Sequence, residues 1–175
     1  RSAAAPPAPQ ELPRGHETVL IVDDDSLVRL SVHHYLEGLG YRVMEASDPS
    51  DALRLSREPG VEPELLLTDV VMPGIGGRSL ARRVRELHSE IGVLFMSAHP
   101  TEELLARGSL EPGDDVLHKP FGQAQLAVAV RRVLDAPRGA APGPAPLSPE
   151  PAPRLRTPAA NGSIRARSNG VPVRR

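Results

Sequence analysis

Reactive side chains follow four short apolar segments of the sequence, each at the point where the segment ends. The segments and the side chains that follow them are 18–22 with Asp23 and Asp24, 65–68 with Asp69, 93–96 with Ser97, and 116–118 with Lys119. Close carboxylates bind hard cations, a hydroxyl donates hydrogen bonds, and an ammonium balances the charge of a phosphoryl group. Together these groups are the components of a phosphoryl-transfer site.

The carboxylates are the strongest part of this pattern. Asp23, Asp24 and Asp69 are expected to lie within a few ångströms of one another. Like charges so close either raise a pKa or recruit a cation, and Mg²⁺ suits a site with few carboxylates and water-filled positions. Taken singly, an aspartate can instead cap a helix or lie in a solvated turn. That is the expectation for Asp25.

Lys119 is the only lysine in a chain that otherwise uses arginine for its cations. A flexible ammonium can follow a moving phosphoryl oxygen, whereas a rigid guanidinium prefers a fixed bidentate partner. An exposed lysine without a role is the simpler explanation of this residue taken alone. Its place at the end of an apolar segment favours a role in the site.

The apolar segments are typical of buried strands in a parallel sheet. They are short, nearly continuous and rich in β-branched residues, as expected for strands that are covered on both faces. A weaker strand is predicted at residues 41–46. In open parallel sheets, ligands bind beyond the carboxyl ends of the strands. We therefore expect the carboxylates, the hydroxyl and the ammonium to meet at one edge of the sheet.

Segments with helical spacing alternate with the strands. In the first of them Ser26 is the predicted N-cap, and Leu27, Leu30, Val32 and Leu36 are predicted to face the core. The alternation, five times over, predicts an α/β fold with a doubly wound, five-stranded parallel sheet. The other predicted helices, with inward positions of the third and fifth, are 48–55, 78–87 (Leu80, Val84 and Leu87), 101–105 and 123–134 (Leu126, Val130 and Val133).

The two ends of the chain differ in composition from its middle. Residues 1–15 are rich in alanine and proline, and residues 136–175 hold nine of the 20 prolines and seven arginines against one acidic residue. Segments with so few large apolar side chains cannot offset the entropy cost of ordering, so both ends are predicted to be disordered. One folded domain is expected over residues 16–135, which is long enough for a single core.

Composition also limits the environment and the partners. The chain has no cysteine, which excludes disulfides and fits a reducing compartment, and it has no apolar run long enough to span a membrane. A cytoplasmic location is expected. The arginines near the C-terminus are scattered without aromatic residues, and no helix-turn-helix pattern is visible. No DNA-binding domain is therefore predicted.

In this order and spacing, the segments VLIVDDD, LLLTDVVMPGIGG, VLFMSAH and VLHKPF resemble the receiver domain of two-component response regulators. The resemblance covers about residues 17–135 and implies a flavodoxin-like (βα)₅ fold. The residue roles that it implies are a phosphoacceptor at Asp69, Mg²⁺ ligands at Asp23, Asp24, Asp69 and the carbonyl of Val71, a switch hydroxyl at Ser97, an essential lysine at Lys119, and a cis bond before Pro120.

The resemblance implies a signalling switch that takes a phosphoryl group from a phosphohistidine onto Asp69 with Mg²⁺ bound. The donor would be a histidine kinase or a phosphotransfer protein, and the domain's own catalysis would be limited to self-phosphorylation and slow autodephosphorylation. The stretches GHETVLIVDDD and ELLARGSLEPGDDVLHKPF are most similar to receivers at the C-termini of hybrid sensor histidine kinases. A fragment of such a kinase, a stand-alone regulator and a weak homodimer all stay open.

Two features of the sequence bear on how such a switch would work. Receivers often carry an aromatic residue three positions before the lysine, where this chain has Val116, so the conformational signal is expected to be small. Val71 and His99 would flank the path of the water that hydrolyses the acyl phosphate. We expect the apolar side chain of Val71 to make this hydrolysis slow.

A phosphatase of the haloacid-dehalogenase type is the alternative from a different class. The string DDDS at residues 23–26, after a buried strand, resembles its first motif, with Asp23 as the nucleophile. In that family the lysine precedes a later acidic pair, whereas Lys119 follows the pair at residues 114–115. Asp69 would then have no role. Identifying which aspartate becomes phosphorylated separates the two functions.

Overall fold

Five parallel strands form one sheet in the order β2-β1-β3-β4-β5, in a computed structural model that describes residues 11–137. The chain winds outward from β1 in one direction and then in the other, which makes the sheet doubly wound. The predicted α/β fold with a five-stranded parallel sheet is confirmed. The strands are β1 (Thr18–Val22), β2 (Arg42–Ala46), β3 (Leu65–Asp69), β4 (Gly92–Ser97) and β5 (Val116–His118).

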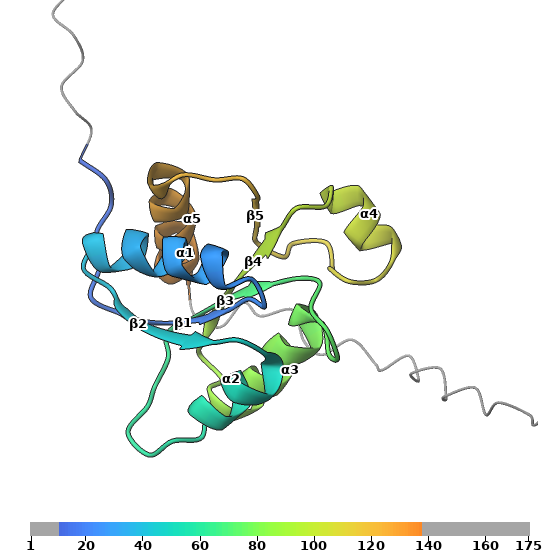
Figure 1. The fold of residues 1–175 in the computed structure, drawn as a ribbon, viewed down its shortest axis with the longest axis horizontal. Helices are drawn as coiled ribbons and strands as arrows, with labels where there is room; N and C mark the ends of the chain where they lie inside the picture. The colour runs from blue at the N-terminus through green and yellow to red at the C-terminus, as the bar shows by residue number, and fades with distance from the viewer. Residues whose placement is uncertain (1–10, 138–175) are drawn as a thin grey trace, which may run out of the picture. The chain divides into compact units, whose positions relative to one another are not determined.

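The helices form a layer on each face of the sheet (Figure 1). Helices α1 and α5 pack on one face, and α2 and α3 pack on the other, with the short α4 beside β5. Each helix follows the strand of the same number, as in a chain of five strand–helix units. The helices are α1 (Ser26–Gly38), α2 (Pro49–Leu55), α3 (Gly77–Leu87), α4 (Thr101–Ala106) and α5 (Gln123–Asp135).

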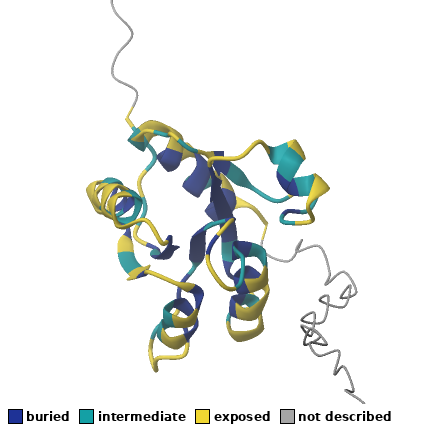
Figure 2. Ribbon diagram, turned by 45° about the vertical axis from the view of Figure 1, so that its right-hand side comes forward, coloured by how far each residue is buried: buried dark blue, intermediate teal, exposed yellow. Residues whose placement is uncertain are grey.

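Both faces of the sheet are apolar because successive side chains of a strand point to opposite faces. In β1, Val19 and Ile21 pack with the α1 and α5 side, while Leu20 and Val22 pack with the α2 and α3 side. All four side chains are fully buried, and Figure 2 shows burial concentrated along the strands. Each such side chain contributes about 1.5–3 kcal/mol to folding. The sheet is therefore a rigid base for whatever its edge carries.

Two inward positions predicted in α1 are wrong. Leu27 and Leu30 are 72% and 65% exposed, whereas Val32 and Leu36 are buried as predicted. A helix turns by about 100° per residue, so Leu27 and Leu30 lie roughly opposite to Val32 on its circumference. The true buried stripe continues from Val32 toward the N-terminus through Val28, which packs partly against the core.

The N-cap of α1 is one residue earlier than predicted. Asp25, and not Ser26, is the N-cap of α1, because its Oδ1 accepts from the backbone N–H groups of Leu27 and Val28 at 2.8 and 3.4 Å. The prediction of Ser26 as cap is wrong, and the expectation that Asp25 caps a helix is met.

In α3 the predicted inward Leu87 is 43% exposed, because the helix ends there at the rim of an open hollow.

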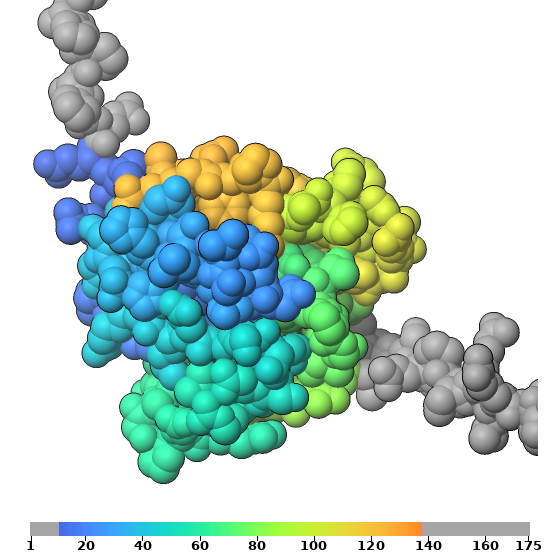
Figure 3. Space-filling model, viewed as in Figure 1, coloured from blue at the N-terminus to red at the C-terminus, as the bar shows by residue number. Residues whose placement is uncertain are grey.

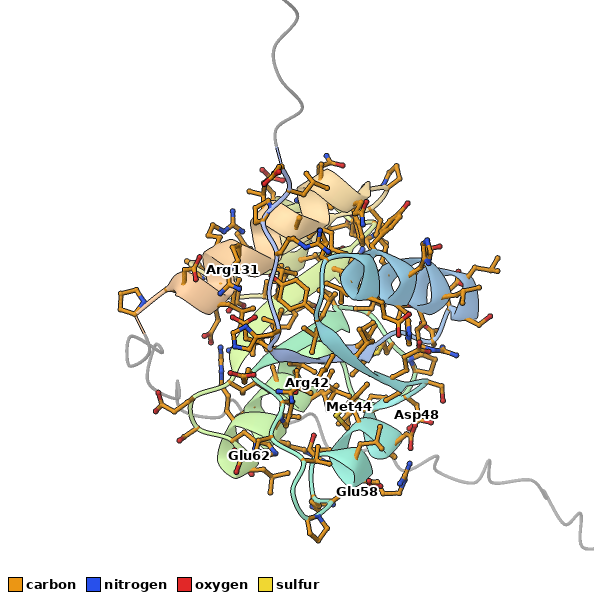
Figure 4. All side chains as sticks on the ribbon, turned by 90° about the vertical axis from the view of Figure 1, so that its left-hand side faces the viewer. Arg42, Met44, Asp48, Glu58, Glu62 and Arg131 are labelled. Carbon is orange, nitrogen blue, oxygen red and sulfur yellow. The ribbon has the colours of Figure 1, made fainter. Side chains whose placement is uncertain are left out.

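The predicted disordered ends fall mostly on residues 1–10 and 138–175, which lie outside the described residues. Within the described part, the backbone N–H of Gly15 donates to Leu39 at 3.1 Å, and Leu12 packs against the core on the α1 and α5 side. Glu17 pairs with Arg131 of α5 at 2.8 Å; Arg131 is labelled in Figure 4. No helix among residues 11–137 has the length and apolar character to cross a membrane.

Candidate functional site

The register of the sheet brings four strand ends to the same edge. Val22 of β1 pairs with Thr68 of β3, so Asp23 and Asp69 leave neighbouring strands side by side. Across the next pairs, Asp69 lies opposite Met96, which precedes Ser97, and Ser97 lies opposite His118. Lys119 follows His118. The sequence-predicted side chains therefore emerge in one row at the carboxyl edge of the sheet.

Three carboxylates of this row form a close group. Asp23, Asp24 and Asp69 each offer an oxygen, and these oxygens all lie within 4.8 Å of one another. Asp23 is buried, Asp69 is half-buried and Asp24 is exposed, so the group opens to solvent on one side. Figure 3 shows the start of α1 (blue) bordering the segment that leads into α3 (green) on this side of the molecule.

Asp23 is held at both of its carboxylate oxygens. Its Oδ1 accepts from the backbone N–H of Asp25 at 2.9 Å, and its Oδ2 accepts from the ammonium of Lys119 at 2.6 Å. The side chain is only 1% exposed. A buried carboxylate is stable when donors of this kind compensate for lost hydration. Asp23 is therefore a fixed member of the group.

Lys119 joins the acidic group to the neighbouring strand. Its Nζ lies 2.6 Å from Asp23 and 3.3 Å from Asp69, and its backbone N–H donates to the carbonyl of Ser97 at 2.8 Å. Burial opposes the charged ammonium, but the hydrogen bond to Asp23 and the charges of Asp69 and Asp23 outweigh it and raise the pKa of Lys119. The ammonium is therefore charged at neutral pH. The Lys119–Pro120 peptide bond is cis.

For Asp69, the effect of burial on the pKa outweighs that of the nearby ammonium. Burial raises the pKa of its carboxyl above the ordinary value and the charge of Asp23 adds to the rise, although the Lys119 ammonium partly lowers it. The helix that follows approaches closely: a Cβ placed on Gly77 would overlap the carbonyl oxygen of Asp69. Asp69 is thus a partly desolvated carboxylate in a tightly packed turn. Lost hydration makes a carboxylate more reactive toward an electrophile.

Ser97 is buried at the end of β4, and its hydroxyl closes a short turn. The Oγ accepts from the backbone N–H of His99 at 2.9 Å and lies 3.3 Å from the His99 carbonyl. The next turn of chain is tied to β5, because the Thr101 hydroxyl lies 2.9 Å from Nε2 of His118. Ser97 therefore connects the site to the start of α4.

Val71 and His99 lie on the loops that follow β3 and β4. Both side chains are exposed, Val71 to 50%. They stand two residues beyond Asp69 and Ser97, respectively, so both belong to the solvent-facing side of the edge. Part of the site's entrance is thus apolar.

The side chains present fit a magnesium ion. The donors are carboxylate oxygens, which are hard ligands, and their separations allow one ion to contact more than one of them. Asp24 is exposed, which leaves room for the waters that Mg²⁺ retains. Three negative charges against one ammonium also leave a net negative group. Asp23, Asp24 and Asp69 are the side chains that would hold the ion.

Arg29 of α1, which the sequence pattern did not single out, contacts the turn at Asp23. Its Nη1 donates to the backbone carbonyl of Asp23 at 2.6 Å. Its position six residues after Asp23, in the first turn of the predicted helix, was the only available signal. Without the N-cap known, that spacing does not show whether the side chain points back toward the turn.

The acidic pair needed by the phosphatase alternative lies elsewhere. Asp114 and Asp115 precede β5, and the carbonyl of Asp115 accepts from Phe95, so the pair is at the end of the strand opposite to Lys119. Asp115 also pairs with Arg132 of α5 at 2.8 Å. This arrangement does not place the pair beside Asp23.

Comparison with known proteins gives one family. A family model described as the response regulator receiver domain matches residues 19–131. The chain is 37% identical over 124 residues to Sensor kinase CckA of Brucella abortus, covering 69% of this chain and 13% of that protein. It is 40% identical over 119 residues to the Transcriptional activator protein ExaE of Pseudomonas putida, covering 66% and 54%. The chain thus spans about half or less of these relatives.

Solved structures agree with the fold. The receiver domain from Hybrid Histidine Kinase CckA is 32% identical with a TM-score of 0.56, covering 67% of this chain and 98% of that one. A response regulator receiver protein from Sinorhizobium medicae is 28% identical with a TM-score of 0.61, covering 69% and 96%. The match therefore includes almost the whole of each solved structure.

Proposed function

The chain belongs to the response regulator receiver domain family, and from this membership we propose that it is the phosphoacceptor switch of a two-component phosphorelay. The resemblance read from the sequence motifs is confirmed by the family match and by the receiver domain of a hybrid kinase. The acceptor, the ion and the donor are the parts that we propose for this chain.

The proposed reaction is the transfer of a phosphoryl group from a phosphohistidine to Asp69. A carboxylate oxygen of Asp69 attacks the phosphorus, the phosphorus–nitrogen bond breaks, and its electron pair returns to the imidazole of the donor. Bound Mg²⁺ would supply positive charge against the phosphoryl oxygens. Lys119 binds another of these oxygens, and Ser97 donates a hydrogen bond to a third. The domain contributes position and charge, while the donor contributes the energy.

One observation carries the proposal: the Asp69 carboxylate lies beside an ammonium and an acidic pair. Lys119 is 3.3 Å from Asp69, and the oxygens of Asp23 and Asp24 lie within 4.8 Å. Asp23 is a poor nucleophile in this setting, because both its oxygens already accept hydrogen bonds. Asp69 is the member of the group that is raised in pKa and reaches solvent.

The proposed donor is a histidine kinase or a phosphotransfer protein. A phosphohistidine is made at the expense of ATP, so we place the domain in the cytoplasm with its donor. A receiver of a hybrid kinase and a separate regulator use the same chemistry, and a weak homodimer is compatible with both. Slow hydrolysis of the acyl phosphate returns Asp69 to its free state.

The test is to find which aspartate carries the label. The full chain is treated with acetyl phosphate and Mg²⁺, and intact mass with peptide mapping identifies the phosphorylated residue. We expect the label on Asp69, its loss in Asp69→Asn and after chelation by EDTA, and its retention in the control Asp114→Asn, because Asp114 lies before β5 and Lys119 follows that strand. A label on Asp23 that survives Asp69→Asn would overturn the proposal in favour of a phosphatase-type nucleophile.

A further inference from the structure

Arg29 links the metal-binding turn to the edge strand of the sheet. Its Nη1 donates to the carbonyl of Asp23 at 2.6 Å, and its Nε lies 3.8 Å from Oε2 of Glu45 on β2. The side chain of Arg29 is 17% exposed, so solvent competes little for these contacts. Glu45 is itself held by the ring of His33, one helical turn after Arg29. The guanidinium thus has a partner on each side.

The turn that Arg29 contacts fixes the backbone of Asp24. On one side of Asp24, the carbonyl of Asp23 accepts from Arg29 and its carboxylate accepts from the N–H of Asp25. On the other side, Asp25 caps α1 through the N–H groups of Leu27 and Val28. Asp24 is exposed, so these backbone contacts set the direction in which its side chain leaves the turn.

We propose that Arg29 is a positioning residue, which holds Asp23 and Asp24 in the geometry that binds Mg²⁺, and that Glu45 holds Arg29. The inference rests on the proposed magnesium site and adds a residue that touches neither the ion nor the phosphoryl group. Mutation of groups that orient metal ligands typically weakens metal binding by about 10–100-fold.

Electrostatics alone predicts the opposite sign. A guanidinium beside the acidic group repels a cation, so its removal would strengthen metal binding if charge were its only effect. Loss of an orienting hydrogen bond would weaken metal binding, because the carboxylates would then have to be ordered by the ion. The direction of the change in affinity therefore separates positioning from charge.

The experiment is a Mg²⁺ titration of the full chain by isothermal calorimetry. We expect Arg29→Gln to weaken Mg²⁺ binding by about tenfold, at the lower end of the range for groups that orient metal ligands. Arg29→Lys keeps the charge but cannot reach both Asp23 and Glu45, so its affinity should lie between wild type and Arg29→Gln. Glu45→Gln should weaken binding in the same direction and by less.

Arg42→Gln is the matched control. Arg42, labelled in Figure 4, is the first residue of β2. It pairs with Thr18 at the start of β1, whereas Asp23 follows the last residue of β1. Arg42 points to the α2 and α3 side of the sheet with Met44, whereas Arg29 and Glu45 lie on the α1 side. The substitution therefore removes an equal charge away from the acidic group, so its Mg²⁺ affinity should equal that of wild type. Thermal denaturation of each variant establishes that the fold is intact before the affinities are compared.

A second measurement needs no metal. The N–H of Asp25 donates to Asp23, so its hydrogen exchange, followed by NMR in EDTA, reports the order of the turn. Exchange should be faster in Arg29→Gln and unchanged in Arg42→Gln. Equal or tighter Mg²⁺ binding by Arg29→Gln, with unchanged exchange, overturns the inference. If wild type itself binds no Mg²⁺, the proposed function fails, while the exchange rates still decide the role of Arg29.

Discussion

Lys119 donates a 2.6 Å hydrogen bond to Asp23, a carboxylate that is almost completely buried. The same ammonium is farther from Asp69, at 3.3 Å. The only lysine of the chain is thus oriented mainly by the carboxylate of a proposed metal ligand, and it lies within reach of the proposed acceptor. A small change in its direction would bring it to a phosphoryl oxygen on Asp69.

Lys119→Arg should keep the charge and lose most of the phosphorylation. A planar guanidinium needs more room than the ammonium between Asp23 and Asp69, and it binds best to a fixed partner. We expect labelling by acetyl phosphate to slow by about tenfold or more, as for the loss of one charge-stabilising donor. Initial rates at saturating Mg²⁺ provide the measurement. Wild-type rates in this variant would show that the ammonium has no special role.

Val71→Asn should shorten the lifetime of the phosphorylated form. An amide at this exposed position can hydrogen-bond the attacking water, which valine cannot do. A hydrogen bond is worth about 1 kcal/mol, or roughly fivefold in rate. The decay is followed by intact mass after removal of the donor. Val71→Ala is the control, because it reduces bulk without adding polarity; an unchanged lifetime in Val71→Asn contradicts the prediction.

The reactivity of Asp69 should fall as the pH is lowered. Because burial and Asp23 raise its pKa, Asp69 becomes protonated at a higher pH than an ordinary aspartate, whose value is 3.8. A protonated carboxyl is not a nucleophile, so labelling is lost as the pH falls through the raised pKa. Carboxyl ¹³C shifts measured without Mg²⁺ follow the titration directly. Lys119→Gln removes a charge that lowers this pKa, so the midpoint should move further up.

The raised pKa of Asp69 also affects the free energy of unfolding. The fold disfavours the ionised carboxylate of Asp69, so the protein is destabilised at neutral pH, and this destabilisation is relieved as the pH falls through the raised pKa. The pH dependence of the melting temperature of wild type, compared with Asp69→Asn, measures this part of the prediction. A midpoint at or below 3.8 would contradict both parts.

Gly77→Ala should destabilise the protein although it places a better helix former in α3. Helix propensity alone predicts a gain of at most about 1 kcal/mol, the value for a helix interior, since Gly77 is the first residue of α3. The new Cβ would overlap the backbone carbonyl of Asp69, and overpacking of this kind costs about 1–3 kcal/mol. Chemical denaturation should therefore show a net loss. Gly38→Ala in α1 is the matched control, since its Cβ would meet only the flexible amide of Gln123, and it should be neutral or stabilising.

The strands and the acidic group could be predicted from sequence because they depend on short-range pattern. An apolar run such as Leu65–Asp69 shows where a strand ends, and parallel pairing then brings the ends together. The buried face of α1 could not be read so easily. Leu27 and Leu30 are apolar but exposed, whereas Val32 and Leu36 are buried. The exposed and the buried residues differ only in their angular position around the helix.

Individual side-chain contacts could not be predicted from the sequence. The bond from Arg29 to the Asp23 carbonyl depends on how Asp25 starts the helix, because one residue of displacement rotates every later side chain by about 100°. The contact between Thr101 and His118 joins two segments whose separation is set by the short β5. Neither residue type, taken alone, indicates its partner.

Strand β5 consists of three residues and has a neighbour, β4, on one side only. Segments with few backbone bonds open at the lowest free energy, so this margin of the sheet should fluctuate before the centre does. Its last residue is followed by Lys119. The cation that we propose to bind an incoming phosphoryl group therefore follows the strand expected to open most easily, so the ammonium can shift while the carboxylates stay in place.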